Sequence, residues 1–540
     1  MPSSNQVLSM SSRNQPPRLK AFDRLLLHLL AIYGGIALIA LLLVPHLFLP
    51  AEDAVILFKY SHNLATQNAI TFFAGGPHTE GATDFAWMVL LALAERCGLP
   101  PFWACAILNV LSLIGLAGIL LRLAGRRVAL MPVLAIAGAA ALFPQIFAAA
   151  FGFAVLPDAL LIALLVLCIV REQVAWAGLC GFLLCLFRPD AVVIVVPLMA
   201  SFWFDREHRK TNSATVAMTF LLPGALYFLW RWHYFGEFLP LPFLVKSDTP
   251  RILGWFVGPS FHASLPFLGF IGIVLSLLPR PWATRTWLLV FALIGAPTFF
   301  YWAMRLDQDV SYRFFYYLPL AAAILLAVNW TALQARRIWG LRIVFAAWLL
   351  LFSMPLKREF RTFRDMQFRD MKAIGDDLHH LPTHGVILTT EAGFLPYYSG
   401  WTSYDAWGLN TARFAHRFIQ PADVTRLQPD LILLHPDFSE RCIVQSDWQP
   451  AYTSRAWPHM TRNLILGADP AQYELWVSSF GSEFYRQRRQ WRYGEGDREC
   501  WFVRKDSPIR DAIEHALAAH HGIPPGQAVA LEQARTSTTP

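Results

Sequence analysis

An apolar stretch near the start of the chain decides the class of this protein: residues 25–48 read LLLHLLAIYGGIALIALLLVPHLF. About 20 consecutive apolar residues are enough for a helix that crosses a lipid bilayer. Four basic residues precede the stretch: Arg13, Arg18, Lys20 and Arg24. Because the stretch is too long for a signal-peptide core and no small-residue cleavage site follows it, we expect a retained transmembrane helix. The basic flank predicts that residues 1–24 form a cytoplasmic tail.

The rest of the chain repeats this apolar character. Of its 540 residues, 55% are hydrophobic and 15% are charged, whereas soluble globular proteins carry about 25% charged residues. This composition excludes a soluble multidomain enzyme, a nucleic-acid-binding protein and a disordered scaffold. Ten further apolar stretches bring the predicted total to eleven spans: 102–121, 129–150, 155–170, 174–187, 190–204, 214–234, 262–279, 286–303, 314–331 and 340–355.

The charges between the spans predict the topology. An odd number of spans places the two ends of the chain on opposite sides of the membrane. The segments that alternation assigns to the cytoplasm carry 16 basic residues, counting the four in the N-terminal tail, and four acidic ones, as the positive-inside rule requires. We therefore expect a multi-pass protein of the bacterial inner membrane, and we interpret the net charge of +8 as a topology signal.

The outward segments differ in kind from the cytoplasmic ones. Residues 49–101 form a long periplasmic loop with an apolar patch at residues 87–93, which suggests a helix lying on the membrane surface. After residue 355 charged residues return and apolar runs shorten to strand length, as at 385–390 and 430–434. The predicted architecture is a polytopic α-helical membrane domain over 25–355, followed by a small periplasmic α/β domain.

The boundaries of this outward part are expected at residues 356–507, with a flexible tail over 508–540. An Ala- and His-rich helical stretch directly beyond Ser507 is expected to lead into the Ser- and Thr-rich end of this tail. Cys442 and Cys500 both fall in the predicted periplasmic domain, where an oxidising compartment permits a disulfide between them. Two unpaired thiols fit the sequence equally well. The chain has no CxxC, HExxH or clustered His and Cys spacing that indicates a structural metal site.

Two adjacent carboxylates, Glu52 and Asp53, begin the first outward loop directly after the first predicted span. A partly desolvated carboxylate is more basic than one in water, so this pair is able to deprotonate an acceptor hydroxyl. The alternative is an acidic helix start after Pro50, which the helix dipole favours.

The longer context of these carboxylates carries a family resemblance. Residues 52–64 read EDAVILFKYSHNL and residues 80–87 read EGATDFAW. This pattern resembles the first periplasmic loop of GT-C membrane glycosyltransferases, and is closest to the branch that contains the actinobacterial terminal arabinofuranosyltransferases. Lys59, Ala82 and Asp84 depart from the Arg, Tyr and Asn of that branch. Further segments fit the resemblance in the same order: 188–190, 231–246, 307–314, 390–400 and 405–410.

The resemblance implies a lipid-phosphate sugar donor, and a departing phosphate needs cations placed where its negative charge accumulates. We expect donor-phosphate contacts from basic residues at outward membrane boundaries: Lys59, Arg188, Arg231, Lys246 and Arg313. Some of these side chains are equally able to anchor helices by snorkelling to lipid phosphates. The matching segments also imply substrate-binding roles for Tyr60, Asn63, Glu80, Asp84, Asp190, Asp307 and Glu391. For Glu391, turn capping is the alternative.

Together these features predict a GT-C-type membrane glycosyltransferase that moves a sugar, such as arabinofuranose, from a polyprenyl-phosphate carrier to an envelope glycan, lipid or protein acceptor. Asp53, assisted by Glu52, is the expected catalytic base of an inverting reaction. A divalent cation near this pair is compatible with the residues but not required by them. The alternative is a lipid-linked sugar transporter or flippase that binds the same headgroup without chemistry. The absence of an internal sequence repeat weakens that alternative, since many transporters carry one.

Overall fold

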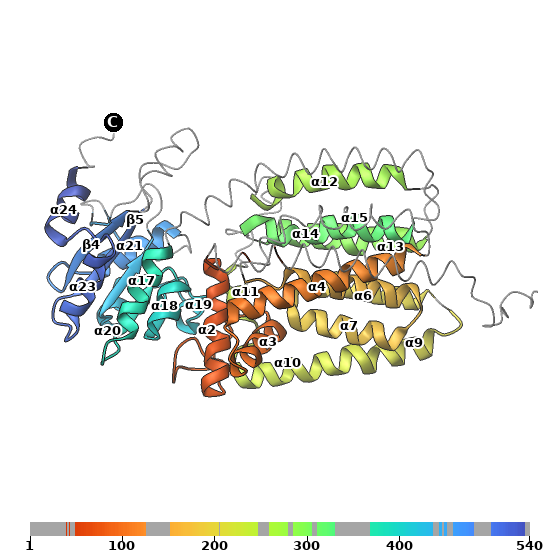
Figure 1. Ribbon diagram of the computed structural model, residues 1–540, viewed down its shortest axis with the longest axis horizontal. Helices are drawn as coiled ribbons and strands as arrows, with labels where there is room; N and C mark the ends of the chain where they lie inside the picture. The colour runs from red at the N-terminus through yellow and green to blue at the C-terminus, as the bar shows by residue number, and fades with distance from the viewer. Residues whose placement is uncertain are drawn as a thin grey trace, which may run out of the picture.

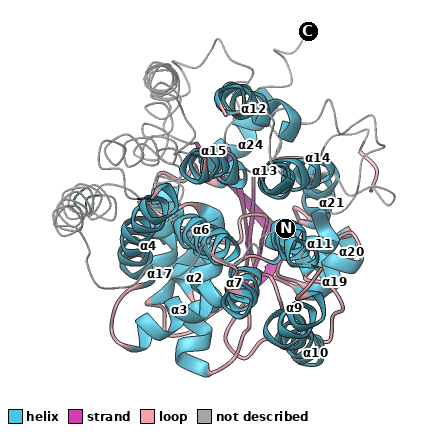
Figure 2. Ribbon diagram, turned by 90° about the vertical axis from the view of Figure 1, so that its right-hand side faces the viewer, coloured by secondary structure: helices cyan, strands magenta, loops and turns pink. Residues whose placement is uncertain are grey.

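A computed structural model describes residues 49–101, most of the part after residue 367 and much of the apolar part between them. The described residues are 49–125, 152–204, 206–246, 259–278, 284–304, 310–329, 368–435, 442–444, 448–450, 457–479 and 498–534, with Ile39 and Leu43. The apolar helices run side by side along the long axis of the molecule, and an α/β domain covers one end of this bundle (Figure 1). Viewed along the bundle, most of these helices appear end on, with the sheet behind them (Figure 2).

The bundle is built from helices that are apolar on most sides. Its segments are α4 (Pro101–Ala124), α6 (Val155–Val170), α7 (Val174–Phe187), η2 (Pro189–Ala191), α8 (Val192–Met199), η3 (Ala200–Trp203), α9 (Arg209–Val216), η4 (Ala217–Leu221), α10 (Leu222–Phe235), α12 (Pro259–Leu277), α13 (Thr284–Val290), η6 (Phe291–Gly295), α14 (Ala296–Ala303), η7 (Val310–Phe315) and α15 (Tyr317–Val328). Helices α6 and α15 are almost wholly buried at its centre, whereas α10 exposes Leu226 and Leu229. Outward-facing leucines on an apolar helix fit a lipid environment.

Among the described residues, three continuous helical stretches are long and apolar enough to cross a membrane: 101–124, 209–235 and 284–303. Eight of the eleven predicted spans fall on described helices, and the spans predicted at 155–170 and 174–187 have the same bounds as α6 and α7. The spans predicted at 129–150 and 340–355 lie outside the described residues, as does nearly all of 25–48. The total of eleven therefore stays a prediction.

The first outward loop contributes two helices at the end of the bundle, α2 (Glu52–Gln67) and α3 (Phe85–Arg96). Helix α2 lies across the bundle axis, between the bundle and the α/β domain (Figure 1). The Trp87 indole N–H of α3 donates to the Gly152 carbonyl at 3.0 Å and fixes the loop to the bundle. A short helix, α11 (Leu241–Lys246), follows α10 at the same end.

The α/β domain has a five-stranded sheet in the order β2-β1-β3-β5-β4. Its strands are β1 (Val386–Thr389), β2 (Thr402–Asp405), β3 (Leu431–Leu434), β4 (Tyr473–Ser479) and β5 (Arg498–Arg504). Strand β1 is parallel to β2 and β3, and β5 is antiparallel to β3 and β4. The strands expected at 385–390 and 430–434 correspond to β1 and β3.

The helices of this domain include α18, which connects the parallel strands β1 and β2 and lies next to α2 (Figure 1). They are α17 (Phe368–His379), α18 (Phe394–Ser399), α19 (Ala412–His416), α20 (Pro421–Leu427), α21 (Trp457–Gly467), α23 (Arg510–Ala519) and α24 (Pro525–Ala534).

Helix α23 lies where a helical stretch is expected beyond Ser507, whereas α24 occupies part of the range expected to be flexible. Helices α23 and α24 occupy most of that range, and residues 535–540 lie outside the described part. Ile513 and Leu517 of α23 are buried in the same apolar cluster as Trp501 of β5, and Ala528 of α24 packs in the cluster of Val477. Burial of these apolar side chains against the sheet stabilises both helices.

Candidate functional site

A cavity of about 890 Å³ opens where the bundle, the first outward loop and the α/β domain meet. Its walls come from α2, α7, α8, α10, α11 and η7, with Leu409 and Asn410 from the α/β domain. Most of the lining is apolar, including Phe182, Val196 and Phe243. Eight ionisable Asp, Glu, Lys and Arg side chains interrupt this apolar surface: Asp53, Glu80, Asp84, Arg188, Asp190, Arg231, Lys246 and Arg313.

Asp53 reaches the cavity from the first turn of α2. The Arg313 guanidinium donates to its Oδ2 atom. Burial by itself raises the pKa of Asp53, but the positive charges of Arg313 and Lys246 and the Arg313 hydrogen bond outweigh it and hold the pKa below its ordinary value. Asp53 is thus an ionised carboxylate at rest, with two cations beside it.

Arg188 and Arg231 each have a carboxylate partner. The Arg188 Nη2 donates to Asp190 Oδ2 at 2.7 Å and its Nε donates to Oδ1 at 3.1 Å. The Tyr301 hydroxyl also donates to Asp190. Arg231 donates through Nε and Nη2 to Glu80 and through Nη1 to the Phe238 carbonyl at 2.7 Å. The charge of each guanidinium is therefore largely balanced before any ligand arrives.

Arg313 and Lys246 keep unused donors. The Arg313 Nη1 atom is buried and has no hydrogen-bond partner among the described residues, and its guanidinium lies 4.1 Å from the centre of the Phe153 ring. Within the same described part of the chain, no hydrogen bond or ion pair to the Lys246 ammonium is recorded. An unsatisfied buried N–H costs about 1–3 kcal/mol, so an anion between these two cations would relieve an existing penalty.

Glu52 faces away from the cavity, although it is next to Asp53 in the chain. Its carboxylate accepts the backbone N–H groups of Gly393 at 2.5 Å and Phe394 at 3.1 Å, at the start of α18. Burial raises the pKa of Glu52 to about 7, against the opposing effect of these two hydrogen bonds. Glu52 therefore joins the outward loop to the α/β domain.

Three other predicted site residues also lie off the cavity and hold the loop together. The Lys59 ammonium, 2% exposed, donates to the Pro396 carbonyl of α18, and burial lowers the pKa of Lys59 to about 7. The Tyr60 hydroxyl accepts the Gly81 N–H at 3.2 Å, and the Asn63 side-chain amide donates to the Thr71 carbonyl at 2.8 Å.

The remaining predicted substrate-binding residues do not all line the cavity. Asp84 lines the cavity, and burial raises its pKa although the Arg188 charge opposes this. Glu391 is buried in the α/β domain outside the cavity lining, where burial and the neighbouring Glu52 and Asp53 charges raise its pKa. Asp307 lies outside the described residues.

Sequence reasoning did not single out two features of the site. Asp158, fully buried in the first turn of α6, lies 3.9 Å from the Arg188 Nε atom and forms a second carboxylate neighbour for it. Leu409 and Asn410 bring the α/β domain into the cavity wall. An acidic residue in an apolar span is the signal that predicts such a position for Asp158.

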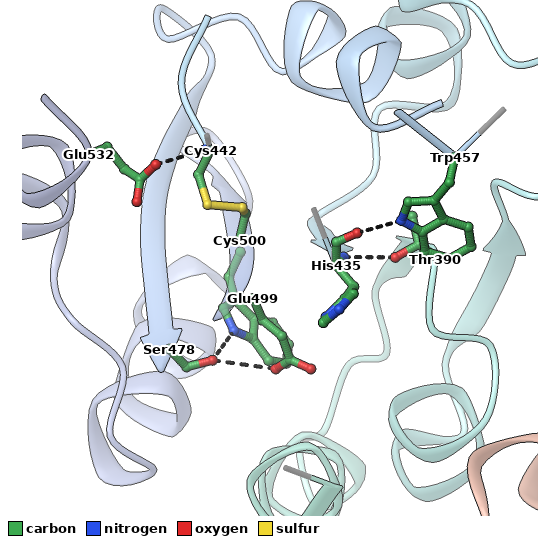
Figure 3. Close-up of a disulfide and its surroundings, with 9 residues drawn as sticks. Thr390, His435, Cys442, Trp457, Ser478, Glu499, Cys500 and Glu532 are labelled. Carbon is green, nitrogen blue, oxygen red and sulfur yellow. Dashed lines mark hydrogen bonds between the residues drawn. A yellow bond between two sulfur atoms is a disulfide. The ribbon is translucent and has the colours of Figure 1, made fainter. Parts of the chain in front are cut away.

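The two cysteines of the α/β domain do not line the cavity. Cys442 and Cys500 form a disulfide between a loop and β5, and the Cys442 N–H donates to Glu532 of α24 at 2.9 Å (Figure 3). Among the described residues no group of three or more His, Cys, Asp or Glu side chains is arranged to hold a metal ion.

Comparison with known proteins shows which fold this chain is similar to. A family model described as a domain of unknown function (DUF8728) matches residues 359–495, and no curated protein matches the chain significantly. ArnT from Cupriavidus metallidurans bound to undecaprenyl phosphate superposes with a TM-score of 0.52 at 12% identity, over 77% of this chain and 94% of that one. The apo state of the same ArnT superposes with a TM-score of 0.51 at 13% identity, over 78% of this chain and 94% of the ArnT chain.

An oligosaccharyltransferase from Archaeoglobus fulgidus in the apo form aligns less well, with a TM-score of 0.48 at 11% identity over 91% of this chain and 78% of its own. The similarity to ArnT confirms the predicted GT-C-type fold of a membrane protein. The arabinofuranosyltransferase-like branch stays a prediction.

Proposed function

We propose that this chain is a membrane glycosyltransferase that uses a polyprenyl-phosphate sugar as donor and an envelope glycan, lipid or protein as acceptor, on the periplasmic side of the bacterial inner membrane. The observation that carries the proposal is the position of Asp53, Arg313 and Lys246 at the polar part of a largely apolar cavity. An apolar cavity suits a lipid chain, and two cations with donors unpaired among the described residues, beside a carboxylate base, suit the phosphate that the lipid carries. The resemblance of the solved ArnT complex, which holds undecaprenyl phosphate, supports this donor class.

The donor phosphate binds between the Arg313 Nη1 atom and the Lys246 ammonium. Arg offers a fork of N–H donors and Lys a point charge, and both suit phosphate oxygens. Binding draws these cations toward the phosphate and away from Asp53. Since the same cations hold the Asp53 pKa low, donor binding raises the basicity of this carboxylate at the moment it is needed.

In the reaction, Asp53 accepts the proton of the acceptor hydroxyl while the oxygen attacks the anomeric carbon. The bond between that carbon and the phosphate oxygen breaks, and its electron pair leaves with the phosphate. Arg313 and Lys246 stabilise the negative charge that accumulates there. Attack opposite the leaving group inverts the anomeric configuration.

The two pre-formed ion pairs serve the sugar rather than the phosphate. Arg231 with Glu80 and Arg188 with Asp190 present carboxylate oxygens and guanidinium N–H groups on the cavity wall, and such paired groups recognise hydroxyls without a net charge. Glu52 acts as a positioning residue for Asp53 through its contact with α18. Arabinofuranose remains the sugar suggested by the sequence resemblance.

Transfer of radiolabel from a panel of polyprenyl-phosphate sugars tests the proposal. Membranes that contain the protein are expected to pass label from one donor into a glycan, lipid or protein fraction. Transport of labelled donor across vesicles without transfer to any acceptor would instead assign the chain to the flippase alternative.

A further inference from the structure

A cluster of arginines on the α/β domain has no part in the cavity chemistry. Arg413, Arg417 and Arg426 all contact the same Oδ1 atom of Asp423, Arg413 at 3.4 Å. Their side chains are 46%, 41% and 46% exposed, whereas that of Asp423 is 2% exposed. We call these three arginines with Asp423 the arginine cluster.

The arginine cluster carries an excess of positive charge. Among the described residues, Asp423 is the one carboxylate that forms ion pairs with the three arginines. Its other oxygen, Oδ2, accepts the Gln420 backbone N–H at 2.9 Å and caps α20. One carboxylate faces three guanidiniums, so the cluster has a formal charge of +2 on a solvent-exposed surface and suits an anionic partner.

Neighbouring contacts place the arginine cluster near the membrane surface. The exposed aromatic side chains of Trp230, Trp232 and Phe238 mark the outer end of α10, and such aromatic belts lie at the boundary between lipid tails and headgroups. Glu237, within this belt, is hydrogen-bonded to His416 at 2.8 Å. His416 immediately precedes Arg417, so the cluster begins beside the headgroup layer.

The packing of α19 supports the same position. Phe414 and Ala415 of α19 are buried in one cluster with Leu241 and Val245 of α11, which follows α10 at the end of the bundle. Bilayer headgroups extend about 5–7 Å beyond the hydrocarbon on each side. A guanidinium on α19 therefore reaches phospholipid phosphates without movement of the domain.

We infer that the arginine cluster binds the headgroups of anionic phospholipids in the outer leaflet and holds the α/β domain against the membrane. This contact bears on the cavity, because Arg413 follows Asn410 of the cavity wall by three residues, which limits the distance between their Cα atoms to about 11 Å. Anchoring α19 thus steadies the edge of the chamber. The inference concerns lipid binding and does not depend on glycosyl transfer.

The test compares two double variants of the full chain in detergent. R413Q/R417Q removes the excess charge but leaves the Arg426–Asp423 pair that supports α20. K505Q/R510Q removes the same charge from another part of the domain, just after β5 and in α23, where Arg510 pairs with Glu474 and Glu514. Native mass spectrometry then counts bound phosphatidylglycerol, phosphatidylcholine and polygalacturonate, an acidic glycan, with thermal unfolding as the check on folding.

Removal of two arginines is expected to weaken the phosphatidylglycerol site of the cluster by about 30-fold, which corresponds to about 1 kcal/mol for each charge near an anionic surface. K505Q/R510Q and phosphatidylcholine binding are expected to show no change. Equal phosphatidylglycerol binding by the wild type and R413Q/R417Q would overturn the inference. So would a loss of polygalacturonate binding alone, which would assign the cluster to an acidic glycan.

Discussion

Gly393 permits a close contact between the α/β domain and Glu52 of α2, and its replacement by alanine gives a sharp test of that contact. A Cβ atom at this position would lie 2.5 Å from the Glu52 carbonyl oxygen and 2.7 Å from its carboxyl carbon. Both distances are below any real Cβ contact, and one of them involves backbone. The G393A variant must therefore push Glu52 away from the start of α18.

Two hydrogen bonds to the Glu52 carboxylate are lost or lengthened by this displacement. Each hydrogen bond to a charged group contributes about 1.5–3 kcal/mol, so the docking contact loses about 3–6 kcal/mol at a pH where Glu52 is ionised. Asp53 follows Glu52 directly on α2, and a displacement of about 1 Å at a reacting group costs about 100-fold in rate. We expect a transfer rate reduced by about 100-fold.

Hydrogen exchange at pH 8 and a transfer assay measure the two effects. The backbone amides of Gly393 and Phe394 are expected to exchange faster in G393A. Gly526 in α24 gives the matched control, because a Cβ there meets nothing within 4 Å, and G526A is expected to behave as the wild type. Unchanged exchange together with a wild-type rate in G393A would refute the role of Glu52 in joining the two parts.

Three other predictions concern the cavity cations, the pH dependence and the disulfide. R313Q is expected to lower kcat by at least 100-fold with a smaller change in KM, because Arg313 has the spare buried donor. R231Q is expected mainly to raise KM. Equal effects on kcat and KM in both variants would contradict the separate roles of the two arginines. Because burial raises the pKa of Glu52 from 4.5 to about 7 against two backbone hydrogen bonds, the stabilisation linked to its protonation is fully present below pH 4.5 and is lost as the pH rises through 7, while the hydrogen bonds to the ionised form remain. Thermal unfolding of E52Q is expected to lack this decline, and an identical pH profile in E52Q and the wild type would count against it. The C442S/C500S variant lacks the disulfide, whose cysteines are 58 residues apart in the sequence. The free energy of unfolding of the α/β domain is expected to fall by about 4 kcal/mol, because the unfolded chain is no longer closed into a loop. Urea titration measures the loss, and the reduced wild type is expected to unfold like the variant.

The sequence predicts the helices of the bundle well because each is a local feature. The apolar stretches at 155–170 and 174–187 are separated by Arg171, Glu172 and Gln173, and helices α6 and α7 begin and end at the predicted residues. Charged residues cannot remain in the apolar layer without a partner. The boundaries of an apolar helix can therefore be predicted from the local sequence.

The partners of the site residues are not predictable in this way. Asp53 and Arg313 are 260 residues apart, Glu80 and Arg231 are 151 apart, and Glu52 and Gly393 are 341 apart. Local patterns place each of these residues at the outer end of the bundle but do not pair them. The sequence therefore treats five basic residues alike, whereas the structure separates Lys59 from the cavity.

Residues 508–540 show a different limit, because a helical stretch is expected directly beyond Ser507 but α24 is not. Their sequence is rich in Ala, His, Gly and Pro, which favours a flexible tail by composition. Ile513, Ala516 and Leu517 nevertheless follow the spacing of one helix face, and all three are buried. This short apolar pattern is the signal from which α23 was predictable.

The central claim is that Asp53 accepts the proton of the acceptor while the polyprenyl phosphate leaves. The most direct test is the single-turnover rate of sugar transfer by purified D53N with saturating donor, measured beside the wild type. Since the amide retains the size of Asp53 but cannot accept the proton, we predict at least a 1,000-fold loss in rate, with the protein folded and the donor still bound. A D53N protein that transfers sugar at the wild-type rate would contradict the account.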